Sequence, residues 1–327
     1  MEKYIFYFDS GTTNSRGYLM AADGTLLGSK KCAVGSKDST IAGDNSVLID
    51  ALYTLYTELL RDNGLSDADI GQIYASGMVT CPYGLCDVPH VCVPVTVESF
   101  AKQIYPFFED KRFHREIRLV RGLKTVGDSA KEINIVRGEE IEVIGVMPEL
   151  SRRFGDREVA AILPGSHTHT LLVKDGAIRD LLSNFTGELY CAIGKDTILS
   201  PVLNAKVDQY DAASIRQGVN NLRKYGFTRA LYICRAMQVF NEGTETTRAS
   251  YAEGVILGGL CQALDCFREE KWPGLQDLVI VADAKSADVY SKLLENCRHD
   301  FRIHTLISDR QRIPALDGIR VLMRSVQ

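Results

Sequence analysis

The opening stretch of the chain constrains the fold more than any other. Tyr4 to Phe8 is an apolar run, rich in aromatic and β-branched residues, that is too short for a helix of its own. Asp9-Ser10-Gly11 ends this run, and an extended pattern resumes from Arg16 to Met20. The sequence therefore predicts a buried strand, a polar turn and a second strand that runs back beside the first.

The turn carries residues that suit phosphate chemistry. A carboxylate at the end of a strand, here Asp9, can hold a hydrated Mg²⁺, which takes few protein ligands besides phosphate oxygens. Gly11 lets the backbone approach an anion, and Thr12, Thr13 and Asn14 add hydrogen-bond donors. An ordinary hairpin with a polar tip would show the same residues, so the rest of the chain has to decide between the two.

Length and charge narrow the class of protein. With 327 residues the chain exceeds the size at which one core usually stops growing, so we expect two domains. The formal net charge is −4, whereas proteins that bind nucleic acid or an anionic membrane usually carry an excess of positive charge. No apolar stretch approaches the ~20 residues of a spanning helix, and Asp9 comes too early for a signal peptide. We expect a cytoplasmic protein without a nucleic-acid or membrane partner.

The nine cysteines and the neighbouring histidines form no metal-binding motif. No C-x-x-C pair occurs, and the spacing of Cys81, Cys86 and Cys92 matches no zinc pattern. We expect reduced, mostly buried thiols. His167 and His169 would share one face of a strand, but a third ligand is not visible, so we predict no metal site there.

Helical and extended patterns alternate along the chain. Apolar residues recur at helical spacing from Ser46 to Arg61, and Asn63-Gly64 follows as a stop signal. Alternation of this kind predicts the α/β class. We expect further helices over 97–107, 137–149, 212–225, 251–267 and 286–297, and strands over 70–75, 117–120, 158–163, 168–173 and 278–282.

The opening pattern returns about 150 residues later. A charged break at 151–156 precedes a predicted strand, the turn Pro164 to His167 and a returning strand. We therefore expect two similarly built domains, residues 1–150 and 151–327, facing each other across a central cleft. Two such turns would hold a nucleotide's phosphates and Mg²⁺ between them. Duplication with D-x-G-T turns is the pattern of the actin and hexokinase superfamily, whose domains have the actin-like (ribonuclease H-like) ATPase fold.

Motifs in a fixed order give the chain a closer resemblance. D-x-G-T-T-N-x-R opens the chain at 9–16, G-M-V follows at 77–79, RGEEIEVIG at 137–145, LPGSH at 163–167 and TGE at 186–188. In this order the motifs resemble those of the 2-dehydro-3-deoxygalactonokinases, sugar-acid kinases that phosphorylate 2-keto-3-deoxy-galactonate at O6 with ATP. The resemblance covers most of the chain. It implies ATP and Mg²⁺ as cofactors, a small sugar acid as the substrate and a role in galactonate degradation, and it leaves room for a homodimer.

The resemblance and the residue chemistry together suggest site residues. We expect Asp9, which would face Mg²⁺ through water, and Glu139, which would accept the substrate's hydroxyl proton, to be catalytic. We expect the sugar acid to be bound by Asn14, Arg16, Met78 and Arg137. We expect the nucleotide to be bound by Gly11, Thr12, Thr13, Gly165, Ser166, His167, Thr186, Gly187, Glu188 and Asp283.

Several of these residues have a purely structural alternative. Arg16 could be an ion-pair residue, Met78 a core residue and His167 a packed turn residue. Adjacent residues on a helix point about 100° apart, so only one of Glu139 and Glu140 should face the site. The other would then be a favourable charge at the helix N-terminus.

The chain departs from the family's pattern at a few positions. His169-Thr170 stand where the family usually has Lys-Trp, Arg121 replaces a Pro, and Asp283 replaces a Gly beside the nucleotide. The Asp283 carboxylate would crowd or repel ATP unless Lys285 compensates, or it caps the following helix. Two alternatives to the kinase therefore stay open: a non-catalytic or repurposed member that binds a sugar acid, and an ATPase or phosphatase on the same fold.

Overall fold

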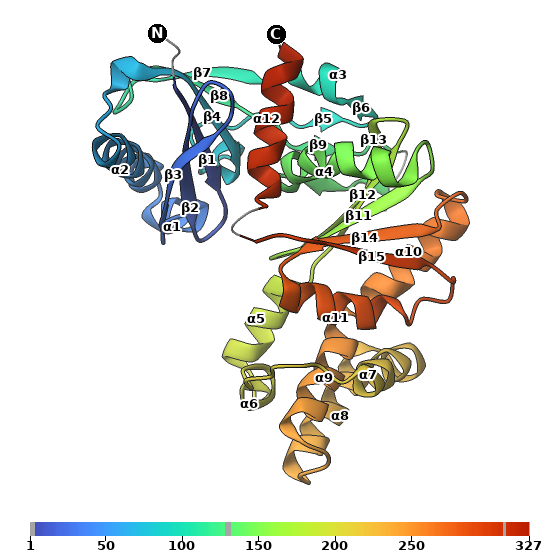
Figure 1. Ribbon diagram of the computed structural model, residues 1–327. Helices are drawn as coiled ribbons and strands as arrows, with labels where there is room; N and C mark the ends of the chain where they lie inside the picture. Colours follow the sequence, from blue (N-terminus) through green and yellow to red (C-terminus); the bar gives the residue numbers. More distant parts are fainter. Residues whose placement is uncertain (1–3, 128–131, 310–311, 327) are drawn as a thin grey trace. The chain divides into compact units, whose positions relative to one another are not determined.

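The computed structural model describes residues 4–127, 132–309 and 312–326 (Figure 1). The chain divides into two compact units. The first comprises Met1–Arg153, Gly176–Leu181 and Ile313–Gln327, and the second comprises Phe154–Asp175 and Leu182–Arg312. The predicted domains over 1–150 and 151–327, and the cleft between them, stay predictions.

A mixed six-stranded sheet is the centre of the first unit. Its strands are β1 (Tyr4–Ser10), β2 (Ser15–Met20), β3 (Leu26–Cys32), β4 (Ile70–Gly77), β7 (Tyr105–Glu109) and β8 (Arg115–Leu119), in the order β3-β2-β1-β4-β8-β7. Strand β1 is antiparallel to β2 and parallel to β4, and β4 is parallel to β8. The strand, turn and returning strand predicted at the start of the chain are confirmed, as are the strands predicted over 70–75 and 117–120.

Helix α2 (Ser46–Asp62) packs against this sheet and confirms the helix predicted over 46–61. Its buried Leu48, Leu52 and Tyr56 share a hydrophobic core with Phe6 and Phe8 of β1. Successive residues of a strand point to opposite faces, and Phe6 and Phe8 are two residues apart, so both reach the face that α2 covers. Burial of these side chains fixes the register of β1 and hence the place of Asp9 at its end.

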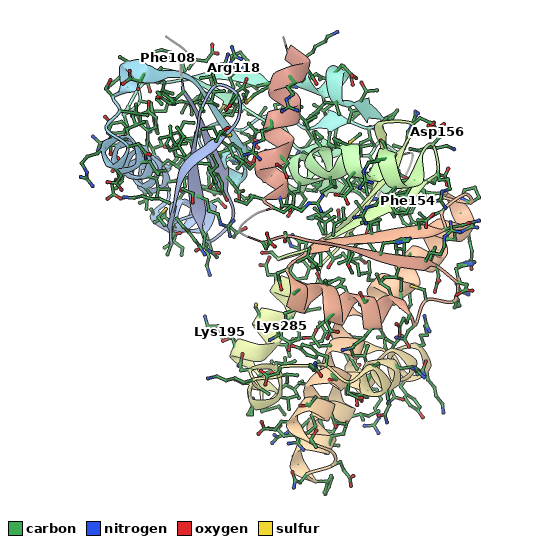
Figure 2. The ribbon with its side chains drawn as sticks, in the orientation of Figure 1. Phe108, Arg118, Phe154, Asp156, Lys195 and Lys285 are labelled. Atoms are coloured by element: carbon green, nitrogen blue, oxygen red, sulfur yellow. The ribbon has the colours of Figure 1, made fainter. Side chains whose placement is uncertain are left out.

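The helix predicted over 97–107 is wrong in its second half. Helix α3 (Val97–Ala101) ends after 5 residues, and β7 follows as an edge strand paired with β8. Tyr105 and Phe107 are half-buried, whereas Pro106 and Phe108 are exposed, which is the period of a strand. Figure 2 shows Phe108 and Arg118 on these two neighbouring strands.

Helices α4 (Glu139–Phe154) and α12 (Pro314–Val326) pack closely within the first unit, and Figure 1 shows them side by side. Two glycines permit this approach. A Cβ on Gly145 would lie 2.1 Å from the carbonyl oxygen of Pro314, and one on Gly318 would lie 1.9 Å from that of Ile141. The helix predicted over 137–149 is confirmed, although it begins at Glu139 and continues to Phe154.

Smaller elements complete the first unit. A three-stranded sheet has the order β10-β9-β5, and β6 pairs with Ala177 and Ile178 at the start of β13. The bounds are α1 (Ser36–Ala42), the 3₁₀ helices η1 (Asp67–Asp69) and η2 (Met78–Thr80), β5 (Val91–Cys92), β6 (Val95–Thr96), β9 (Leu123–Lys124), β10 (Ile135–Val136) and β13 (Ala177–Asn184), which belongs to the first unit as far as Leu181.

The second unit repeats the arrangement of the first around its own sheet. Its strands are β11 (Val159–Pro164), β12 (Thr168–Lys174), β14 (Asp277–Ala282) and β15 (Arg302–Ile307), in the order β15-β14-β11-β12. Strand β11 is antiparallel to β12 and parallel to β14, as β1 is to β2 and β4. The predicted second strand–turn–strand is confirmed, and so is the strand predicted over 278–282.

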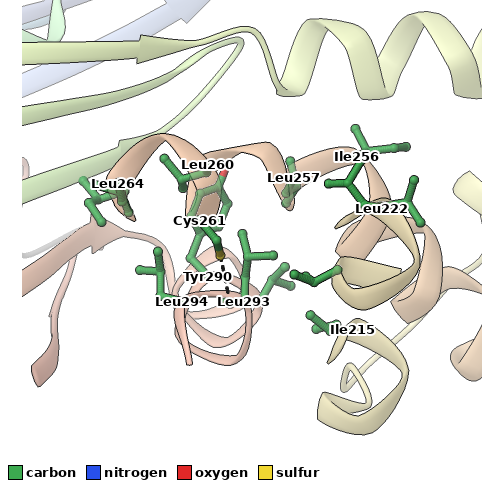
Figure 3. Close-up of a cluster of buried hydrophobic side chains, with 14 of the residues drawn as sticks. Ile215, Leu222, Ile256, Leu257, Leu260, Cys261, Leu264, Tyr290, Leu293 and Leu294 are labelled. Carbon is green, nitrogen blue, oxygen red and sulfur yellow. Dashed lines mark hydrogen bonds between the residues drawn. The ribbon is translucent and has the colours of Figure 1, made fainter. Parts of the chain in front are cut away.

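Helices bury the rest of the second unit's core. They are α5 (Gly187–Asp196), α6 (Ser200–Leu203), α7 (Ala212–Tyr225), α8 (Phe227–Val239), α9 (Glu245–Leu257), α10 (Gly259–Glu270) and α11 (Ala284–Leu294). Figure 3 shows side chains of α7, α9, α10 and α11 meeting in this core, where the thiol of Cys261 donates to the carbonyl of Leu293.

Two of the helices predicted in the second unit are confirmed and one is wrong. Helix α7 has the predicted bounds, and α11 confirms the helix predicted over 286–297 with an earlier start. The single helix predicted over 251–267 is instead two helices that meet at Gly258. A Cβ there would lie 2.4 Å from the carbonyl oxygen of Gly254, so the close turn of the chain requires glycine.

The cysteines are free, as expected, but most are not buried. Only Cys81, Cys234 and Cys261 are buried, so the prediction of mostly buried thiols is wrong. The side chains of Cys92, Cys191 and Cys266 are exposed. Among the described residues, none of the helices combines the length and the apolar character that crossing a membrane needs.

Candidate functional site

The turn after β1 places a carboxylate at the carboxyl end of a central strand. Asp9 lies opposite Arg16 in the β1–β2 pair, and its Oδ2 lies 3.0 Å from Nη1 of Arg16. The backbone N–H of Gly11 donates to the carbonyl of Asn14 at 2.8 Å and closes the turn. Burial raises the pKa of Asp9, while the charge of Arg16 and its hydrogen bond act against that shift. The ion-pair role considered for Arg16 is therefore present.

The start of α1 holds the turn from behind. The N–H groups of Ser36 and Lys37 donate to the carbonyls of Gly11 at 3.2 Å and Thr12 at 2.9 Å. A Cβ on Gly35 would lie 2.5 Å from both of these carbonyl oxygens, so only glycine permits the approach. Gly11, Thr12 and Thr13 remain exposed on the other side, where a ligand can reach them.

Close backbone contacts bring the start of α4 to the same edge of the sheet. Ser10 pairs with Gly77 at the end of the parallel strand β4. Gly77 has a φ of 80°, and a Cβ on it would lie 2.3 Å from the carbonyl oxygen of Ser10. A Cβ on Gly138, directly before α4, would lie 3.4 Å from the Cα of Gly77. The first turn of α4 therefore faces the end of β1.

Two glutamates of α4 share the electrostatic environment of Asp9. Burial, together with Asp9, raises the pKa of Glu139 to about 7. Burial, Glu139 and Asp9 raise the pKa of Glu142 to about 8, against the effect of Arg16. Carboxyl groups this close cannot all ionise easily, so Glu139 and Glu142 can hold protons near neutral pH. The structure thus brings Glu139 together with Asp9 and Arg16, as the assigned roles require, and it adds Glu142.

Glu142 was not among the predicted site residues, although its spacing from Glu139 indicates that it shares a helix face with that residue. Glu139 and Glu142 are three residues apart, which on a helix puts them on neighbouring positions of one face. Glu140 points elsewhere, because its Oε2 accepts from the N–H of Gly138 at 2.7 Å and its side chain is fully buried. The expectation that only one of the adjacent pair faces the site agrees with this placement.

The other residues assigned to the sugar acid differ in their burial and in their contacts with the rest of the protein. Arg137 donates to the carbonyl and the hydroxyl of Thr80, and its Nη2 lies 3.4 Å from Nδ1 of His90. Burial and Arg137 lower the pKa of His90 to about 4, so that ring is neutral. Met78 is half-buried in η2, and the half-buried Asn14 donates to the Thr13 hydroxyl at 2.9 Å. The side chain of Arg137 is thus engaged by Thr80 and His90, while its backbone forms a hydrogen bond with the carboxyl group of Glu139.

In the second unit, the residues of the LPGSH and TGE motifs come together. The N–H of Glu188 donates to the carbonyl of Ser166 at 2.7 Å, and a Cβ on Gly187 would lie 2.2 Å from the carbonyl oxygen of Gly165. The buried Thr186 hydroxyl lies 2.8 Å from that of Thr168. The β11–β12 turn therefore rests on the start of α5, and Gly165 and Ser166 stay exposed.

The histidines beside this turn make protein contacts. Nε2 of His167 lies 3.5 Å from Oε2 of Glu188, and the His167 ring packs 5.1 Å from that of Phe185. Nδ1 of His169 lies 2.9 Å from the Ser183 hydroxyl, and burial lowers the pKa of His169 to about 4. Within the described ranges, no three His, Cys, Asp or Glu side chains gather as metal ligands would.

Asp283 caps α11, which is one of the two roles considered for it. Its Oδ1 accepts from the N–H groups of Lys285 at 2.9 Å and Ser286 at 3.0 Å. Burial acts to raise the pKa of Asp283, but the hydrogen bonds from Ser286 and Lys285 outweigh it and lower the pKa. Because β14 and β11 are parallel, Asp283 and the 165–167 turn lie at the same edge of their sheet.

The ammonium group of Lys285 packs over an aromatic ring, and its compensation of Asp283 beside ATP stays a prediction. Its Nζ lies 5.7 Å from the centre of the Tyr210 ring (Figure 2 labels Lys285 at the start of α11). Its charge also acts on Glu253, a buried carboxyl that accepts hydrogen bonds from Tyr190 and Tyr210. Burial raises the pKa of Glu253 to about 7. No motif in the sequence pointed to this buried group.

Comparison with known proteins gives one family. Residues 9–312 match the family described as 2-keto-3-deoxy-galactonokinase. A protein of Rhizobium meliloti (strain 1021) named "probable 2-dehydro-3-deoxygalactonokinase" is 22% identical over 259 residues, which are 78% of this chain and 78% of that protein.

Solved structures show the same fold. A Sinorhizobium meliloti structure named for a 2-dehydro-3-deoxygalactonokinase has a TM-score of 0.75 at 20% identity, over 98% of this chain and 95% of that chain. A glucokinase from Balamuthia mandrillaris matches with a TM-score of 0.47 at 12% identity, over 99% of this chain and 94% of that one. The predicted α/β class is confirmed, and the chain shares its fold with the Sinorhizobium meliloti structure over 98% of its length.

Proposed function

We propose that this chain, which belongs to the 2-keto-3-deoxy-galactonokinase family, transfers the γ-phosphoryl group of ATP to O6 of 2-dehydro-3-deoxy-D-galactonate. Like the family to which it belongs, the protein is a carbohydrate kinase, and it uses ATP. The observation that supports the site is the Asp9 carboxylate at the end of β1, followed by the exposed turn Gly11 to Thr13. The specific sugar acid and the position O6 rest on the family resemblance.

The residues around Asp9 suit a hydrated Mg²⁺. Mg²⁺ keeps several waters and needs one or two protein carboxylates besides phosphate oxygens. The Asp9 side chain is 25% exposed, and only its Oδ2 is engaged by Arg16. Asp9 would therefore hold the ion through water, and the bound ion would neutralise charge on the phosphates. Gly11, Thr12 and Thr13 would contact the transferred phosphoryl group.

Glu139 is positioned to accept the proton of the substrate hydroxyl. In the transfer, the O6–H bond breaks, O6 forms a bond to the γ-phosphorus, and the bond to the β,γ-bridging oxygen breaks to leave ADP. A base with a pKa near the working pH assists this step best, and burial with Asp9 raises the pKa of Glu139 to about 7. Arg16, which forms an ion pair with Asp9, would also bind the carboxylate of the sugar acid.

The second unit supplies residues suited to the nucleotide. Gly165 and Ser166 are exposed at the carboxyl edge of its sheet, where ligands of α/β proteins bind. The hydroxyls of Thr168 and Thr186, with that of Tyr290, fix the start of α5 behind this turn. We assign the phosphates of ATP to Gly165, Ser166, His167 and Thr186 to Glu188, with Asp283 beside them.

An ADP-release assay with and without the sugar acid tests the function. We expect ADP formation that requires both the acid and Mg²⁺, and a product whose phosphorus couples to the C6 protons in NMR. ADP formation without the acid would identify an ATPase, and binding of the acid without turnover would identify a repurposed member. The homodimer and the cytoplasmic location expected from the sequence stay predictions.

A further inference from the structure

We propose that Glu142 is a substrate-binding residue whose carboxyl group forms hydrogen bonds with a hydroxyl group of the sugar acid and so helps to select the substrate. This proposal rests on the proposed function and adds a residue that neither the motifs nor the family description assigned. The geometry of α4, the contacts of its glutamates and the groups that face Glu142 carry it.

The position of Glu142 is fixed by the packing of α4. Its helix is held at one end by the approach of Gly138 to Gly77, and about two turns further on by the contact of Gly145 with Pro314. Glu142 lies between these two contacts and three residues after Glu139, so both glutamates project from one face. That face is directed to the end of β1, because both carboxyl groups interact with Asp9.

The glutamates of α4 differ in the contacts that their carboxyl groups make. Glu140 accepts from the backbone of Gly138, and Glu149 pairs with Arg153 one turn away. The Glu142 carboxyl forms no hydrogen bond or ion pair with any residue that the structure describes, although it is half-buried. A polar group removed from water without a partner is costly, so a ligand that supplies the partner gains that energy on binding.

The groups around Glu142 suit the hydroxyl groups of a polyol. Tyr7 and Asp9 face it from β1, Arg16 and Tyr18 from β2, and Glu139 from its own helix. Sugar hydroxyls donate to carboxyl oxygens and accept from tyrosine hydroxyls and guanidinium groups, so each of these neighbours can take part in binding a polyol.

Steady-state kinetics of Glu142→Ala test the proposal. We expect KM for the sugar acid to rise at least ~10-fold, the size of one or two lost hydrogen bonds, with kcat and KM for ATP within about threefold of wild type. Glu142→Gln, which keeps a donor and an acceptor, should restore KM to within about threefold of wild type. Glu149→Ala, which removes a carboxyl from the same helix away from Asp9, is the matched control and should leave KM unchanged.

Three results would overturn the proposal: an unchanged KM in Glu142→Ala, a loss confined to kcat, or a KM that Glu142→Gln does not restore. If the alanine variant melts below the assay temperature, Glu142→Asp replaces it and should raise KM, because the shorter side chain withdraws the carboxyl. If wild type shows no turnover, the proposed function fails. Calorimetric binding of the sugar acid to wild type and Glu142→Ala then still decides the role of Glu142, and equal affinities would refute it.

Discussion

Oδ2 of Asp9 lies 3.0 Å from Nη1 of Arg16, directly across the β1–β2 pair. The ion pair joins the carboxylate assigned to Mg²⁺ to the guanidinium assigned to the sugar acid. Arg16 acts against the effect of burial on the pKa of Asp9 and so favours the charged carboxylate that a metal needs. The partners are 25% and 47% exposed, so the pair should matter for chemistry more than for stability.

Arg16→Gln should shift the pH dependence of activity. Without Arg16, the pKa of Asp9 rises further, because burial then acts unopposed. Since Asp9 must be ionised to hold Mg²⁺, the acid limb of kcat/KM should move to higher pH, and KM for the sugar acid should rise as its carboxylate loses a partner. Arg61→Gln is the control, because the side chain of Arg61 is 75% exposed beside Asp62. An acid limb that stays in place would separate Arg16 from Asp9.

Glu139 should set a second feature of the pH profile. As a base it must be deprotonated, and its pKa is raised to about 7 by burial and Asp9. Activity should therefore fall about tenfold per pH unit below that value, and Glu139→Gln should remove this limb and reduce kcat by ~10²-fold or more. The measurement is kcat/KM from about pH 5 to pH 8. Wild-type rates that are flat over this range, or a fully active Glu139→Gln, would exclude Glu139 as the base.

The cap at Asp283 should contribute to stability. Asp283→Ala removes the acceptor of two backbone N–H groups and should cost ~1 kcal/mol, whereas Asp283→Ser, itself a good cap, should cost little. The pKa of Asp283 is lowered in the folded state, so this stabilisation is present above the unfolded pKa and is lost as pH falls through the folded pKa. Fluorescence of Trp272, the single tryptophan, buried in the same unit, follows the unfolding in urea. Equal midpoints for the two variants would argue against the cap.

The charge of Asp283 should also affect the nucleotide if it lies beside the triphosphate. Asp283→Ser removes the charge and keeps the cap, so ATP should bind about fivefold more tightly, a gain of ~1 kcal/mol for one partly solvated like-charge contact. A nucleotide titration of wild type and Asp283→Ser measures this. Weaker binding in the variant would mean that Asp283 assists the ligand, for instance at a ribose hydroxyl.

The contact between α4 and α12 should tolerate no side chain. A Cβ on Gly318 would lie 1.9 Å from the carbonyl oxygen of Ile141, so Gly318→Ala should cost ~1–3 kcal/mol of unfolding free energy and displace the start of α4. Gly259→Ala is the control, because a Cβ there meets nothing within 4 Å. Denaturation followed by circular dichroism compares the two. Equal stability of both variants would show that the helices can move apart freely.

Much of the fold could be predicted from local patterns. The apolar residues of helix α7 recur at helical spacing, and strands β1, β11 and β12 are short apolar runs bounded by polar residues. These local patterns were enough to predict the four elements. The failures arose where tertiary contacts decide. Tyr105 to Glu109 joins the sheet only because β8 offers a partner, and at Gly258 a Cβ would lie 2.9 Å from a side-chain carbon of Leu222 in α7.

The candidate site could be predicted in part. Asp9 and its turn carry a local signal, because a carboxylate and glycine follow a buried strand. Glu142 could be found only by counting along the helix from Glu139, and the network of Glu253 with Tyr190 and Tyr210 joins residues far apart in the sequence. Arg137 looked like a substrate residue by its place in a motif, but the contacts with Thr80 and His90 depend on how the chain folds back.

The turnover of Asp9→Asn tests the central claim, that phosphoryl transfer takes place at the end of β1. The isosteric amide keeps the size of the side chain and removes the charge that would hold the metal. ADP formation with saturating sugar acid, ATP and Mg²⁺ should fall at least ~100-fold, with an unchanged melting temperature, while the exposed Asp110→Asn keeps wild-type turnover. Wild-type turnover in a stable Asp9→Asn variant would contradict the account.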